Sequence, residues 1–258
     1  MIPAAFLALT DFGYLGAAVL DVAQLYENKR AAWTAFFAWT AFVAQTATLT
    51  LAAMSAIFGG TLSMTDWMDF LIWLVVGAYL IFGRRTGLST AGAFIFPIVF
   101  VLWVLAAWLL ERPLVVQTAL LWIGAGFAAA AGAAFLLLAV FGIMYIEKER
   151  ELAQKRVRLF YYQLPALDQL DSWTARLLGV GWPMLTAALA VSRLWGPGST
   201  VLSIAPLILW VSYGIIIAGR YMFRWPGHRT AVGVMLAFLA LVVEIYGIAA
   251  ATAYPPLW

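Results

Sequence analysis

Long runs of apolar residues, separated by short polar or charged stretches, make up most of this chain of 258 residues. Most runs approach or exceed the roughly 20 residues that an α-helix needs to cross the hydrocarbon core of a bilayer. The pattern therefore predicts eight membrane-spanning helices joined by short loops. They are approximately Pro3 to Leu25, Ala31 to Phe58, Asp69 to Gly83, Ser89 to Leu110, Leu114 to Ile146, Ser172 to Leu194, Val201 to Phe223 and Arg229 to Ala251.

The third run is the shortest, and we expect it to extend back over Thr65 to Met68 to reach across the membrane. Composition agrees with the pattern, since 65% of the residues are hydrophobic, 10% are charged and the mean hydropathy is +0.95. Soluble domains carry about 25% charged residues. We predict an all-α polytopic membrane helix bundle that forms a single integral membrane domain over residues 1–258.

The fifteen lysines and arginines are distributed unevenly between the two sides of this layout. All except Arg112 and Arg193 lie in or beside the loops that follow the first, third, fifth and seventh helices. Loops rich in lysine and arginine stay in the cytoplasm. We therefore expect a multi-pass protein of a bacterial-type cytoplasmic membrane with both termini outside. This placement accounts for the net charge of +3 without a nucleic-acid partner.

The connector between the fifth and sixth helices, at about residues 147–171, is the longest polar stretch. Helical character continues past the membrane, with Glu151 and Lys155 spaced to pair on one helix face. Leu167, Leu170 and Trp173 then recur at helical spacing, which predicts a short amphipathic lead into the sixth helix. Two interpretations are open: a solvated connector, or a docking site for a cytoplasmic partner.

Several kinds of chemistry are excluded by composition. The chain has no cysteine and one histidine, His228, so disulfides, thiolate sites and multi-histidine metal centres are absent from it. No nucleophile paired with a base and no phosphate-binding loop is recognisable, and we therefore expect neither an enzyme nor a metal site.

Two acidic residues, Asp11 and Glu244, lie inside predicted spans at similar depths in the outer half of the membrane. A charge at the centre of a span costs about 2.5–3.5 kcal/mol on insertion scales, so such residues usually face the bundle interior and a partner. Arg193, near the outer end of the sixth helix, is the candidate partner. The alternatives are a structural ion pair or neutral acid, a pocket for a cationic or porphyrin ligand whose propionate meets Arg193, and a proton site.

Motifs at the connector resemble a known family. The segments Phe141 to Leu152 and Leu164 to Asp171 are similar to the cytochrome c assembly (CcsA/HemX-like) membrane proteins, nearest their HemX branch. Gly92 to Pro97, Gly181 to Thr186 and Gly227 to Ala231 add to the likeness. The resemblance implies eight spans and a role in haem handling for cytochrome c maturation. For the HemX branch it implies an influence on early haem synthesis through the abundance of glutamyl-tRNA reductase.

The resemblance also places a haem site on the outer side. Where the family carries a tryptophan-rich motif after the sixth span, this chain retains Trp195 and Gly196, and the family's intramembrane histidines correspond to Gln45 and about Gly124. Haem is the candidate cofactor, with weakened or lost ligation. The candidate cofactor-binding residues are Asp11, Gln45, Arg193, Trp195, Gly196 and Glu244.

The sequence therefore predicts a HemX/CcsA-like membrane protein of haem handling, cytochrome c assembly or regulation of haem synthesis. The alternative is an accessory structural subunit of a larger membrane complex that kept the fold without ligand binding. The expected partners of this protein are membrane lipid, a membrane protein that packs on its aromatic outer faces, and a cytoplasmic protein at residues 147–171.

Overall fold

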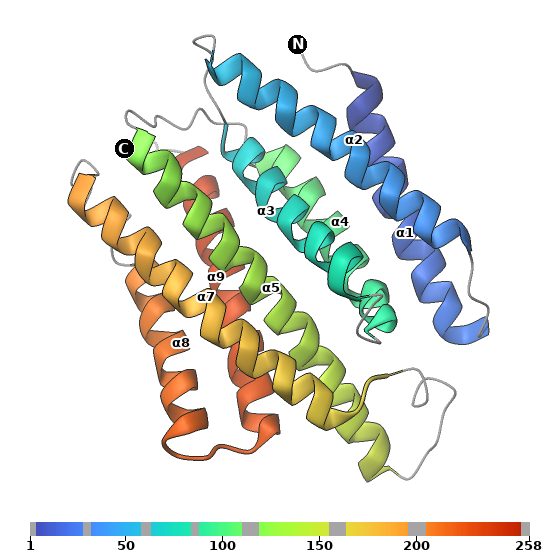
Figure 1. The fold of residues 1–258 in the computed structure, drawn as a ribbon, viewed down its shortest axis with the longest axis vertical. Coiled ribbons are helices and arrows are strands. Elements are labelled where there is room, and N and C mark those ends of the chain that lie inside the picture. The colour runs from blue at the N-terminus through green and yellow to red at the C-terminus, as the bar shows by residue number, and fades with distance from the viewer. Residues whose placement is uncertain are drawn as a thin grey trace.

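The computed structural model describes residues 4–27, 32–57, 63–83, 88–109, 119–154, 164–195 and 205–253 (Figure 1). Within these residues the chain forms eight α-helices, which confirms the predicted all-α class. They are α1 (Ala4–Glu27), α2 (Ala32–Ile57), α3 (Met64–Ala78), α4 (Gly92–Leu109), α5 (Ala119–Ala153), α7 (Leu167–Trp195), α8 (Ala205–Tyr221) and α9 (Gly227–Ala253). A π-helix, Tyr79–Gly83, extends α3, and a 3₁₀ turn, Ser89–Ala91, precedes α4.

The structure confirms that the third helix extends back over Thr65 to Met68, and it moves the start of the sixth helix. Helix α3 begins at Met64 because Ser63 caps it: the Ser63 hydroxyl accepts the Asp66 N–H at 3.1 Å, and the Asp66 carboxylate accepts the Ser63 N–H at 2.7 Å. Asp69 therefore lies inside the helix and not at its start. The predicted lead and sixth span are one continuous helix, α7, with Pro183 inside it, an arrangement that membrane helices tolerate.

The helices pack as two groups of four (Figure 1). In the first group, α1 and α3 each pack against both α2 and α4, so α1 and α3 face each other across the centre. In the second group, α5 packs on α7 and α9, and α8 closes the ring by packing on the same two helices. We call these groups the N-terminal bundle and the C-terminal bundle. Contacts between α3 and α5 join them.

Each bundle has its own apolar core. Ile72, Val75 and Val99 lie fully buried in the core that involves the N-terminal bundle and one side of α5. In the C-terminal bundle, the rings of Phe135 and Tyr213 stack with their centroids 3.7 Å apart. Large apolar side chains also face outward from the helices, as lipid contact requires; examples are Phe12, Val43, Val101, Ile208, Leu236 and Leu239.

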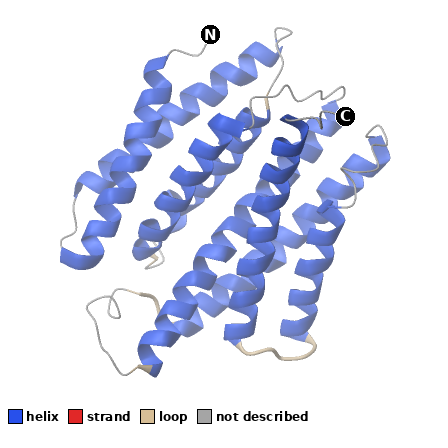
Figure 2. Cartoon of the chain, turned by 180° about the vertical axis from the view of Figure 1, so that it is seen from behind, coloured by secondary structure: helices blue, strands red, loops and turns tan. Residues whose placement is uncertain are grey.

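Helix length and apolarity identify a multi-pass membrane protein. Four helical segments are long and apolar enough to cross a bilayer, and three further apolar helices are shorter. Helix α1 begins and α9 ends at the same end of the molecule (Figures 1 and 2). At the opposite end α5 stops, α7 starts and a short loop joins α8 to α9 (Figure 2). We call this the connector end.

Candidate functional site

The three segments Phe141 to Leu152, Leu164 to Asp171 and Gly227 to Ala231, far apart in sequence, meet at the connector end. They supply most of the lining of a polar cavity of about 450 Å³ between the helices of the C-terminal bundle. Helix α8 and the turn after it supply the rest. The lining residues are Tyr145, Leu167, Asp168, Asp171, Arg220, Tyr221, Arg224, Trp225 and Gly227.

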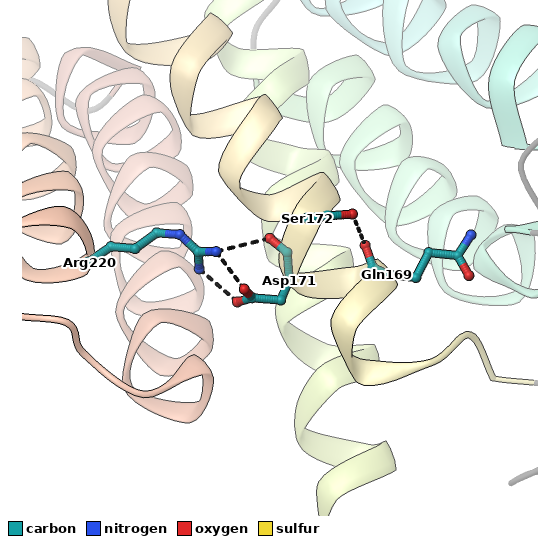
Figure 3. Close-up of polar contacts among 4 residues, drawn as sticks. All are labelled: Gln169, Asp171, Ser172 and Arg220. Carbon is teal, nitrogen blue, oxygen red and sulfur yellow. Dashed lines mark hydrogen bonds and ion pairs between the residues drawn. The ribbon is translucent and has the colours of Figure 1, made fainter.

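A bidentate ion pair between Arg220 of α8 and Asp171 of α7 links two sides of this cavity (Figure 3). The guanidinium group of Arg220 donates to the two carboxylate oxygens at 2.7 and 2.6 Å and to the Asp171 carbonyl at 3.2 Å. The Arg220 side chain is 14% exposed and that of Asp171 is 40% exposed. Because the pair is partly withdrawn from water and doubly bonded, it fixes the end of α8 against the start of α7.

Two further contacts tie the connector to α5 and α9. The Nζ atom of buried Lys148 donates to the Leu164 carbonyl at 3.2 Å, which anchors the chain just before α7. At the other side, Nδ1 of His228 lies 2.6 Å from the Glu149 carboxylate. Both of these side chains are about half exposed, so His228 is accessible to water at the start of α9.

Gly227 is required by the packing at this end. A Cβ atom on it would lie 2.9 Å from Cε2 of Tyr145, and closer still to other atoms of the phenol. The start of α9 therefore rests directly on the Tyr145 ring, and no larger residue fits without movement.

A second cavity, also about 450 Å³, lies between α2, α3 and α5 near the opposite end. Its lining is mainly apolar and includes Trp67, Phe70, Trp73 and Trp122. Two of these indoles are fixed by hydrogen bonds: Trp73 donates to Thr46 Oγ1 at 2.8 Å, and Trp67 donates to the Ala125 carbonyl at 3.0 Å. The cavity suits a flat apolar group or a lipid chain.

The lining of this aromatic cavity does not fit ligation of haem iron. Iron in haem takes imidazole, thiolate, thioether or phenolate ligands, and the lining residues offer none of these. Gln45, the predicted replacement for a histidine, has its amide occupied elsewhere: Tyr14 donates to its Oε1, and its Nε2 donates to the Asp69 carbonyl at 3.1 Å. Gly124 packs against Val191 of α7.

Gln45 belongs to a buried polar cluster at the centre of the N-terminal bundle. Gln45 is fully buried and Asp69 is 8% exposed. The Trp103 side chain is a hydrogen-bond partner of the Asp69 carboxyl group, and Asp11 and Tyr14 lie close enough to Asp69 to interact with it electrostatically. Each of the four helices thus contributes a polar side chain to one interior site.

The predicted outer site is only partly described. Arg193 and Trp195 lie in α7 and Glu244 lies in α9, but their side chains, and Gly196 altogether, fall outside the described residues. Among the described residues, the acid beside Asp11 is Asp69.

The pairing of Asp11 with Arg193 stays a prediction. Helix α7 packs mainly on α5 and α8, whereas α1 packs mainly on α2 and α4. Sequence reasoning passed over Asp69 because it treated the residue as a helix boundary. The capping signal Ser63 to Asp66 would have moved that boundary outward and exposed Asp69 as an interior acid.

Comparisons with known proteins support the resemblance. The chain is 29% identical to Protein HemX of Brevibacillus brevis over 46% of each chain. It is 24% identical to cytochrome c biogenesis protein CcsA of Citrus sinensis, over 34% of this chain and 30% of that one. For CcsA of Trieres chinensis the identity is 27%, over 33% and 30%.

The aligned part thus spans about half the length of HemX and about a third of CcsA. No family model matches the chain, and no solved structure matches it. The predicted similarity to HemX and CcsA is confirmed at this level.

Proposed function

We propose that this chain is a HemX/CcsA-like, non-enzymatic membrane protein of haem metabolism or cytochrome c biogenesis whose working surface is the connector end. The observation that carries this proposal is the convergence of the three family-like segments on one polar cavity. Elements that only span a membrane have no need of an Arg220–Asp171 pair, a buried Lys148 anchor and a fitted Gly227 at the same end.

The proposed topology has eight crossings, with the connector end in the cytoplasm and both termini outside. The described basic residues support it, because all except Arg193 lie towards the connector end of their helices or in the turn between α8 and α9: they are Lys148, Arg150, Arg176, Arg220, Arg224 and Arg229. The common position of the start of α1 and the end of α9 fits an even number of crossings. A cytoplasmic partner would then meet the surface at residues 147–171.

We further propose that the protein works without iron ligation inside the bundle. Two features support this: the amide of Gln45 is held by Tyr14 and Asp69, and the sole histidine pairs with Glu149 at the other end. An absorption spectrum of the purified protein tests it. We expect no stoichiometric Soret band, and a low-spin bis-histidine spectrum from the monomer would contradict the proposal.

Deletion of the gene in its own host separates the proposed role from the accessory-subunit alternative. Two readouts are needed: covalent haem on c-type cytochromes, and the level of 5-aminolaevulinate, the first committed haem precursor. A HemX-like or CcsA-like role predicts that at least one changes and that the wild-type gene restores it. If both stay at the wild-type level while a membrane complex loses stability, the accessory-subunit function holds.

A further inference from the structure

Asp11 and Asp69 lie on helices α1 and α3, which are diagonally opposed in the N-terminal bundle, and they interact electrostatically. The chain of hydrogen bonds from Tyr14, one turn after Asp11, through Gln45 to Asp69 connects the same two helices. Oδ1 of each carboxyl group is buried and has no hydrogen-bond partner in the described part of the chain. Asp69 is more than nine-tenths buried. Trp103 satisfies part of the Asp69 carboxyl group from α4, which leaves Oδ1 directed into an interior site without a donor.

The described side chains of the N-terminal bundle supply no cation to neutralise this pair. The described residues of α1 to α4 include no lysine, arginine or histidine, and α5, packed against α3, carries no charged residue between Ala119 and Ile146. The titratable groups that face Asp69 are Asp11 and Tyr14 from α1 and Asp66 from its own helix. Helices α2 and α4 contribute only the neutral Gln45 and Trp103.

We infer that Asp11 and Asp69 form a proton-binding site inside the membrane, in which a proton on one carboxyl group removes the repulsion between the two. Two negative charges that interact through a medium of low dielectric repel each other. The unpartnered Oδ1 atoms are the positions at which the proton is expected. The proton adds to a carboxylate oxygen when the site loads and leaves to water when it empties, with no other bond changed.

Asp66 is the contrasting acid on the same helix. Its carboxylate already accepts hydrogen bonds from the N–H and the hydroxyl of Ser63, at 2.7 and 2.8 Å. Because these donors occupy the Asp66 carboxylate, Asp66 differs from Asp69 in its hydrogen bonding and serves as a control for location.

Reaction with dicyclohexylcarbodiimide tests the inference on the full-length protein in lipid nanodiscs. This reagent adds a protonated carboxyl group across its C=N bond, so a labelled peptide gains the reagent's whole mass. We expect label on the peptides of Asp11 or Asp69, declining as the pH rises from about 5 to about 9. Asp66 and the exposed Asp168 should stay unlabelled.

Variants then test whether each carboxyl group affects protonation of the other. The Asp69→Asn variant should leave Asp11 without its negative neighbour. The labelling of Asp11 should then be lost at a pH about one unit lower than in the wild-type protein. The Asp11→Asn/Asp69→Asn double variant should not be labelled. If either variant fails to elute as the wild type does in size-exclusion chromatography, the infrared C=O band of a protonated carboxyl group in the wild-type protein provides the second test.

Three results would overturn the site. The first is wild-type protein with no label on Asp11 or Asp69 at any pH in this range. The second is equal labelling of Asp168. The third is protection by Na⁺ at constant pH that N-methylglucamine does not give, since a metal cation would then occupy the position assigned to the proton. None of these results bears on the proposed role of the connector end.

Discussion

The two four-helix bundles place their polar side chains differently. In the N-terminal bundle, Asp11, Tyr14, Gln45 and Asp69 gather at the centre, and the described residues carry no basic group. In the C-terminal bundle the centre is apolar, with Phe135 stacked on Tyr213, and the charged residues other than Arg193 and Glu244 lie towards the connector end.

Access to water explains the difference. At the connector end, Arg220 and Asp171 remain partly exposed, so both can carry charge at little desolvation cost. At the centre of the N-terminal bundle, polar groups persist only as neutral hydrogen bonds or as an acid that keeps a proton. We therefore assign recognition of a partner to the end of one bundle and proton binding to the interior of the other.

The largest expected effect is at Gln45. Replacing it with leucine leaves the Tyr14 hydroxyl buried without its acceptor, at about 1–3 kcal/mol, and removes a second hydrogen bond from the Asp69 carbonyl, which is worth about 1 kcal/mol. The Gln45→Leu variant should therefore lose about 2–4 kcal/mol of stability, seen as a lower thermal midpoint in detergent. The exposed Gln154→Leu is the control and should change stability by less than about 0.5 kcal/mol. Equal thermal midpoints for Gln45→Leu and Gln154→Leu would mean that the hydrogen bonds of Gln45 do not contribute to stability.

An intermediate effect is expected at the ion pair of the C-terminal bundle. Arg220→Leu leaves the Asp171 carboxylate partly buried without its partner. Because Asp171 is 40% exposed, we expect about 2–3 kcal/mol, below the cost of breaking a fully buried pair. The matched variant is His228→Ala, which breaks the water-exposed pair with Glu149 and should cost less than about 1 kcal/mol. Thermal midpoints in the reverse order would contradict the geometry of Figure 3.

The same small substitution should have opposite effects in the two bundles. Tyr14→Phe removes the donor to Gln45 and should cost about 1–2 kcal/mol. Tyr213 has a buried hydroxyl without a partner in the described residues, so Tyr213→Phe keeps the stack on Phe135 and should leave stability unchanged or slightly raised. Denaturation of the two variants side by side measures this difference. Equal losses of stability would show that the two bundle centres do not differ in this way.

The sequence predicted the elements well and their packing poorly. All eight helices lie close to the predicted spans because membrane helices are set by runs of apolar residues, and α3 could have been placed better from the capping signal at Ser63 and Asp66. Helix pairing was not predictable, since lipid is as apolar as a helix interface and the pattern therefore marks no inner face. For that reason Arg193 was the candidate partner of Asp11 and Glu244, which stays a prediction, and the electrostatic interaction of Asp11 with Asp69 was not foreseen.

For the connector, the sequence left open a solvated link or a docking site, and the candidate binding residues were placed on the other side of the membrane. Nothing in the sequence indicates that Arg220, 49 residues from Asp171, completes the cavity. Packing of α8 against α7 turns two ordinary surface charges into a fixed bidentate pair.

The most direct test of the account is complementation of the deletion strain with the Asp168→Asn/Arg224→Gly variant. Both residues line the connector-end cavity and are exposed, and glycine suits the positive φ of Arg224 (50°), so the fold should persist. We predict wild-type amounts of membrane protein but a haem-precursor or cytochrome c level that stays at the deletion value, whereas Ser192→Ala, at an exposed position near the opposite end of α7, restores it. Full complementation by the double variant would contradict the assignment of function to the connector end.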